Sequence, residues 1–99
     1  AGDPNNAAIL VAMRAGQAET AFVLARSLAT ERADDVVALN LLAITAMATG
    51  DVDLSLRSFH QALKLQPENT TIRRNLARLL RNQGQIDEAR RQFERILVD

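Results

Sequence analysis

Apolar residues recur along this chain at the spacing of an α-helix, and short polar turns separate one apolar stretch from the next. Gly16, Gly50 and Gly84 lie in three of these turns and are 34 residues apart. An apolar helical stretch precedes each glycine, and another follows it. A helix–turn–helix pattern that repeats about every 34 residues is typical of helical solenoids. The pattern therefore predicts an all-α fold, an α-solenoid of six antiparallel helices that form three helix–turn–helix repeats.

Residues that cap or break helices predict where each helix begins and ends. Asp3 before Pro4 is a helix start, and the aspartates near residues 34 and 51 are further capping groups. A glycine can adopt the left-handed conformation that ends a helix, and Pro67 prevents the preceding helix from continuing. The expected helices span about 4–15, 18–32, 36–49, 52–65, 70–83 and 86–99. Asp3, Asp34 or Asp35, Asp51, Asp53, and Asn69 or Thr70 are the expected caps.

Small and large apolar residues alternate in a way that suits closely packed helices. Helix backbones approach closely where small residues meet, and larger side chains fill the spaces beside them. The expected small contact residues are Ala43, Ser55, Ala62, Ala77 and Ala89. The expected space-filling residues are Leu39, Leu42, Phe59, Leu76, Leu80 and Phe93.

Composition and charge limit the classes of function. The 99 residues suffice for one domain, and no apolar run reaches the length of a membrane span. A net charge of zero argues against a general nucleic-acid or membrane binder. The charge is uneven, because residues 70–99 hold seven Arg against four acidic residues. The chain does not begin with Met, which leads us to expect a piece of a longer protein.

No residue pattern predicts catalysis or a cofactor. The chain lacks cysteine, and one histidine, His60, cannot form a structural zinc site on its own. There is no phosphate-binding glycine loop, paired carboxylate cleft or nucleophile–base pair. We therefore expect no enzyme activity, no metal site and no cofactor, and a solvent-exposed His60.

The middle of the chain resembles the tetratricopeptide repeat family. Residues 36–69 have the small, aromatic and proline positions of such a repeat, at Ala43, Phe59 and Pro67, with Gly50 in the turn. The third repeat, 70–99, matches less completely, and the first, 2–35, is degenerate. The resemblance implies one domain over 1–99 that binds a protein or peptide on a concave face formed by the first helix of each repeat. The candidate binding residues on that face are Leu10, Met13, Asn40, Leu41, Ile44, Met47, Arg74, Arg78 and Arg81.

Two interpretations remain open for each part of this set. The helix over 36–49 is apolar on nearly every side, so it forms either the centre of the core or the floor of an apolar groove. Arg74, Arg78 and Arg81 share one helix face, which is either simply solvated or contacts an acidic partner. By contrast, Arg73, Arg90, Arg91 and Arg95 lie elsewhere and are expected to pair locally, in the pairs Asp87–Arg91 and Arg90–Glu94.

Self-association is the rival interpretation. The last helix would expose apolar residues, which a second copy of the chain would cover, giving a homo-oligomer. The residues concerned are Ile86, Phe93, Ile96 and Leu97. RNA binding through the arginine face is disfavoured because the chain has neither Tyr nor Trp for base stacking. Neither the partner nor the cellular compartment follows from the sequence.

Overall fold

The computed structural model describes residues 4–98, and it describes the side chains of residues 6–96. These residues form six α-helices: α1 (Pro4–Arg14), α2 (Ala18–Glu31), α3 (Val36–Thr49), α4 (Val52–Leu65), α5 (Thr70–Asn82) and α6 (Ile86–Val98). Each predicted helix is present, and its predicted ends lie within one residue of the observed ones. The all-α prediction is therefore confirmed.

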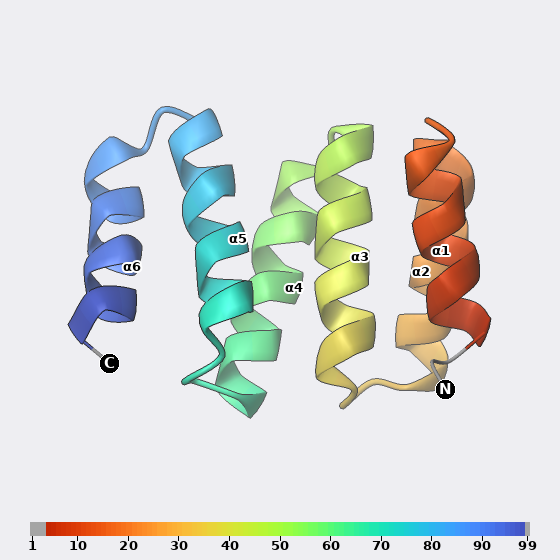
Figure 1. Ribbon diagram of the computed structural model, residues 1–99, viewed down its shortest axis with the longest axis horizontal. Helices are drawn as coiled ribbons and strands as arrows, with labels where there is room; N and C mark the ends of the chain where they lie inside the picture. The colour runs from red at the N-terminus through yellow and green to blue at the C-terminus, as the bar shows by residue number, and fades with distance from the viewer. Residues whose placement is uncertain (1–3, 99) are drawn as a thin grey trace.

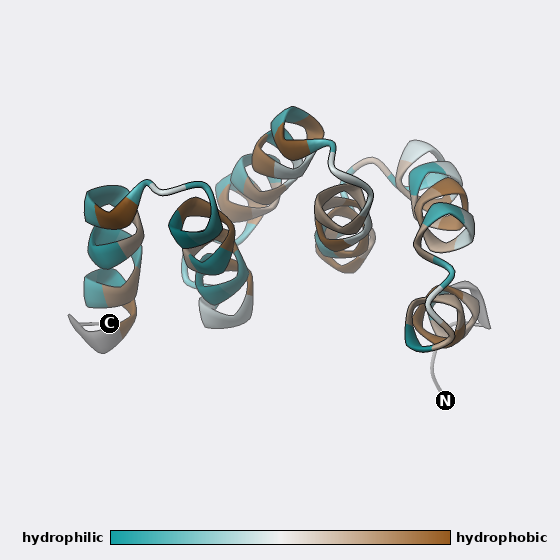
Figure 2. Cartoon of the chain, turned by 90° about the horizontal axis from the view of Figure 1, so that it is seen from above, coloured by the Kyte–Doolittle hydropathy of each residue, from teal (hydrophilic) through white to brown (hydrophobic). Residues whose placement is uncertain are grey.

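The helices stand side by side in chain order along the longest dimension of the molecule (Figure 1), which is 35 Å. Each helix packs against the next one, and α3 also contacts α1 and α5. The first helices of the pairs, α1, α3 and α5, form one layer, and α2 and α4 lie behind it. Seen from above, α3 is set back from α1 and α5, so this layer is concave (Figure 2). The arrangement is that of a helical solenoid.

Three helices begin at a side chain that accepts hydrogen bonds from their first free N–H groups. Oδ1 of Asp35 accepts from the backbone N–H of Val37 at 2.9 Å. Asp51 and Asn69 cap α4 and α5 in the same way, with N···O distances of 3.1 and 3.0 Å. Each such cap stabilises a helix by about 1 kcal/mol. The predicted cap at Asp3 lies outside the described residues.

The glycine turns share one backbone geometry, which Gly50 illustrates. Its φ of 92° is in the left-handed region, which side chains other than glycine rarely adopt. The next residue, Asp51, donates its N–H to the carbonyl oxygen of Ala46 at 2.8 Å and so satisfies one of the last carbonyls of α3. The turns at Gly16 and Gly84 contain the equivalent bond. The 34-residue glycine spacing thus marks the tight turn inside each helix pair.

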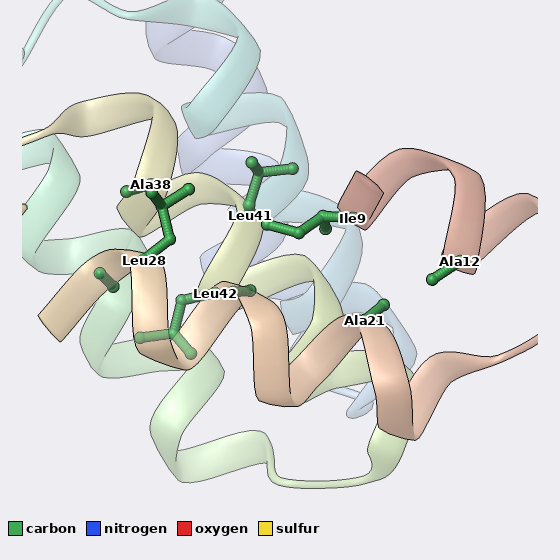
Figure 3. Packing of buried hydrophobic residues seen from close by; sticks show 9 residues of the cluster. Ile9, Ala12, Ala21, Leu28, Ala38, Leu41 and Leu42 are labelled. Atoms are coloured by element: carbon green, nitrogen blue, oxygen red, sulfur yellow. The ribbon is translucent and has the colours of Figure 1, made fainter. Parts of the chain in front are cut away.

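Two clusters of buried residues form the core. The first joins α1, α2 and α3, and the second joins α3, α4, α5 and α6. Helix α3 belongs to both, with Leu41 and Leu42 in the first cluster and Leu39 and Ala43 in the second. Figure 3 shows the first cluster, where Leu41 and Leu42 of α3 lie near Ile9 of α1 and Leu28 of α2.

The residues predicted to lie at close helix crossings are all buried. Ser55 of α4 is fully buried, and its Oγ donates to the backbone oxygen of Ala43 in α3 at 2.7 Å. A larger side chain at residue 55 would separate these two backbones. The predicted space-filling residues are all buried except Phe93, which is half-buried. The other buried small residues are Ala62, Ala77 and Ala89.

Enlarging one of these small residues should destabilise the chain. Ala89 of α6 is buried in the second cluster, so Ala89→Leu is expected to cost about 1–3 kcal/mol through overpacking. Urea denaturation followed by far-UV circular dichroism measures this loss. Glu94→Leu is a suitable control, because Glu94 is exposed on the same helix. Equal stability of Ala89→Leu and the parent chain would contradict the assigned contact.

Candidate functional site

The candidate binding residues occupy equivalent positions on α1, α3 and α5. Residues 34 apart in the chain occupy equivalent positions in successive repeats, so those on α1, α3 and α5 form rows across the concave layer. The row at residue 10 continues at Ile44 and Arg78, and the row at residue 13 continues at Met47 and Arg81. In both rows the first two helices carry apolar side chains and α5 carries arginine. The layer is therefore apolar at one end and cationic at the other.

The apolar side chains in these rows differ in how much surface they expose. Leu10 is 46% exposed. Met13 is half-buried against the first cluster, and Ile44 and Met47 are half-buried against the second. These four side chains leave apolar surface available on α1 and α3.

Leu41 lies in the interior, in contrast to its prediction as a binding residue. It is only 7% exposed and belongs to the first cluster, where it lies near Ile9 (Figure 3). Its side chain points between the first two helix pairs, so it offers a partner little surface. Each of the two interpretations of the helix over 36–49 therefore holds for part of it: Leu41 belongs to the core, whereas Ile44 and Met47 reach the surface.

Asn40 joins two helices of the concave layer. Its Oδ1 accepts a hydrogen bond from Nδ2 of Asn75, with a distance of 3.1 Å between the two atoms. Both side chains are half-buried. This bond connects α3 to α5 and leaves the Asn40 amide nitrogen available for a further bond.

Three of the four arginines of α5, Arg74, Arg78 and Arg81, are exposed and have no ion-pair partner within the described part of the chain. Arg74, Arg78 and Arg81 are spaced by four and three residues, so they share one face. Like charges at this spacing repel one another by a few tenths of a kcal/mol per pair. The arrangement thus favours an anionic group near α5.

Two arginines of α6, Arg90 and Arg91, are paired locally, although not in the predicted pairs, and Arg95 has no ion pair within residues 6–96. Nη2 of Arg91 lies 2.7 Å from Oε2 of Glu88, and Arg90 lies 4.0 Å from Asp87. These are i, i+3 pairs, whereas i, i+4 pairs with Asp87 and Glu94 were predicted. Bonds from Arg91 and Gln92 lower the pKa of Glu88, and the bond to Glu88 raises the pKa of Arg91.

Arg73 is the principal feature that the sequence reasoning missed. It is only 6% exposed, although it was expected to pair locally with acidic residues. Its Nη1 donates to Oε1 of Gln92 at 2.8 Å, and its Nη2 donates to the backbone oxygen of Pro67 at 2.6 Å. Gln92 in turn donates to Oε1 of Glu88 at 3.1 Å. The 34-residue repeat could have indicated that Arg73 is buried, because Arg73 lies 34 residues after Leu39, which is also buried.

The remaining features add no second site to this face. His60 is exposed on α4, as expected. In residues 4–98, every helix is too short or too polar to span a bilayer.

Comparison with known proteins identifies a family and two similar folds. The sequence profile of the tetratricopeptide repeat family matches residues 40–99. A search of curated proteins finds no significant match. MamA from Desulfovibrio magneticus RS-1 (residue 41 to the end) is 16% identical with a TM-score of 0.83, and 90% of this chain aligns with 50% of that one.

The type III secretion translocator chaperone SycD from Yersinia enterocolitica has a similar fold. It is 18% identical with a TM-score of 0.80, and 89% of this chain aligns with 61% of it. The chain thus spans only half to about three fifths of the lengths of these two proteins. At these identities, the likeness concerns the fold alone.

Proposed function

Because the chain belongs to the tetratricopeptide repeat family, we propose that it binds a peptide or a partner helix along the concave layer of α1, α3 and α5. Domains of this family generally mediate protein–protein interactions and are typically non-catalytic. The observation that carries the proposal is the change within each row from apolar residues on α1 and α3 to unpaired arginine on α5.

Apolar side chains of the partner would contact the first two helix pairs. Leu10, Met13, Ile44 and Met47 have accessible apolar surface there. Methionine side chains are flexible and adapt to differently shaped partners. Asn40 lies between this apolar part and α5, and its free amide N–H groups would bond a backbone carbonyl of the partner. Leu41 supports this surface from below.

Acidic side chains of the partner would contact α5. The guanidinium groups of Arg74, Arg78 and Arg81 are exposed and share one face. Guanidinium binds carboxylate through two parallel hydrogen bonds, which favours Asp and Glu in the partner over neutral residues. The partner segment is therefore apolar at one end and acidic at the other.

Replacing the three exposed arginines of α5, Arg74, Arg78 and Arg81, by glutamate should weaken partner binding at least about tenfold and remove most of its salt dependence. Proteins captured from the native source by the parent chain identify the partner, and titration calorimetry at two salt concentrations then measures affinity. A matched control replaces Lys64, Arg90 and Arg95 by glutamate, because these exposed residues lie outside the rows and the net charge changes equally. Unchanged affinity in the α5 variant, or equal loss in both, would contradict the proposed contact.

A further inference from the structure

A groove of about 340 Å³ lies between α2 and α4, which stand behind the concave layer (Figures 1 and 2). Its floor is apolar, because Leu39 and Leu42 of α3 and Ala29 of α2 line it. Arg26 of α2 and Arg57 of α4 line it from the two sides. The other lining residues are Thr30, Ala33, Asp51, Leu54 and Gln61. The groove thus combines an apolar floor with a cation on each wall.

Neither cation of the groove is neutralised by an acidic side chain within residues 6–96. Nε of Arg57 donates only to the backbone oxygen of Asp53, at 3.5 Å, and Arg26 has no side-chain bond. The carboxylate that lines the groove belongs to Asp51, and its Oδ1 accepts from the N–H of Leu54 as the α4 cap. The groove therefore has an excess of positive charge.

The next junction along the solenoid shows how such a cation is satisfied. Residues 34 positions after Leu54 and Arg57 are Glu88 and Arg91. There the carboxylate of Glu88 accepts from Nε and Nη2 of Arg91 at 3.0 and 2.7 Å. In the first junction a leucine replaces the glutamate, so the Arg57 guanidinium lacks the carboxylate that its counterpart has.

The floor differs between the two junctions as well. Leu39 lines the groove, and the residue 34 positions later is Arg73, which extends to Gln92 and Pro67. Polar side chains bonded to one another therefore occupy the second junction, while the first presents the half-buried Leu54 beside the buried Leu39 and Leu42. A ligand for the first junction needs both an anionic group and an apolar side chain.

We propose that the groove between α2 and α4 binds an acidic peptide segment of a partner protein. A Glu or Asp carboxylate of that segment lies between the guanidiniums of Arg26 and Arg57, and a neighbouring aliphatic side chain covers Leu54, the half-buried leucine of the groove. The groove volume is at the lower end of the range for ligand sites, about 300–1,000 Å³, which suits a few residues. This site is on the opposite side of the layer from the proposed concave surface and does not depend on it.

Titration of the ¹⁵N-labelled chain by NMR tests the proposal. The probe is an acetylated pentapeptide amide of sequence alanine–leucine–glutamate–leucine–alanine, and its neutral counterpart has glutamine in place of glutamate. We expect the acidic probe to shift the amide signals of Thr30, Leu42 and Leu54 and the Nε signals of Arg26 and Arg57. Since one exposed charge pair changes affinity up to about fivefold, Arg26→Ala with Arg57→Ala should weaken binding about tenfold. The neutral peptide should bind at least about threefold more weakly than the acidic one.

The control variant is Lys64→Ala with Arg95→Ala, which removes two exposed cations outside both the groove and the concave layer and should leave the titration unchanged. Equal affinity for the two peptides would overturn the proposal, as would shifts confined to α5. Sodium acetate that reproduces the shifts at the same concentration would also overturn it, because the groove would then bind a free anion rather than a peptide. Failure of the α5 variants in the partner-binding experiment would leave this result unaffected.

Discussion

Replacing Phe59 by alanine is expected to lower the free energy of unfolding by about 3–5 kcal/mol. Phe59 is 0% exposed and is the largest fully buried side chain among those that the structure describes. It extends from α4 into the second cluster, which contains residues of α3, α5 and α6. Alanine would leave a cavity there. The surrounding helices are closely packed and can move only slightly, so they would not fill it.

The size of this loss is large for a chain of this length. The free energy of unfolding of a domain of about 100 residues is about 5–15 kcal/mol, so the variant should lose about a fifth or more of its stability. Urea denaturation with far-UV circular dichroism measures the change. Phe59→Leu should cost about 1.5 kcal/mol or less, since it retains most of the volume. Phe22→Ala is the matched control, because Phe22 is half-buried; a loss equal to that of Phe59→Ala would contradict the assigned core.

The second large effect is expected when the buried Arg73 loses its side-chain partner. Gln92→Leu removes the oxygen that accepts from Nη1 of Arg73 and leaves a buried guanidinium with one fewer bond. Hydrogen bonds to charged groups contribute about 1.5–3 kcal/mol, and an uncompensated buried charge adds to the cost. We therefore expect Gln92→Leu to destabilise the chain by about 2–4 kcal/mol.

A second substitution should restore part of this stability. Arg73→Leu removes the charge and introduces the residue found 34 positions earlier, Leu39. The double variant should therefore be more stable than Gln92→Leu alone, although each substitution is destabilising in the parent chain. A double-mutant cycle by urea denaturation measures this coupling, and hydrogen exchange in α6 locates it. Additive losses would show that Arg73 and Gln92 do not act as a pair.

The fold was predictable because local chemistry determines each helix boundary. An aspartate or asparagine cap acts on N–H groups two or three residues away, and the glycine turn involves only the last turn of its own helix. Both are visible in a single sequence, as Asp35 and Gly50 show. The buried small residues were predictable for a related reason, since close helix crossings admit few side chains.

The site was less predictable because exposure depends on how helix pairs stack. Leu41 and Ile44 are both apolar residues of α3, yet one lies between the first two pairs and the other reaches the surface. Pairing in α6 depended on rotamers, because Glu88 and Asp87 are both within reach of Arg91, and the observed bond goes to Glu88. The groove between α2 and α4 requires two helices that are far apart in the chain, so no local pattern indicates it.

Helix α3 supplies residues to both clusters, and this couples the stability of the two ends of the chain. If α1 and α2 detached, Leu41 and Leu42 would become exposed to water; if α5 and α6 detached, Leu39 would lose its cover in the same way. Each terminal helix pair therefore covers a different side of α3. Unfolding of either terminal pair destabilises α3, against which the other terminal pair packs. The chain therefore unfolds as one cooperative unit rather than as three independent helical hairpins.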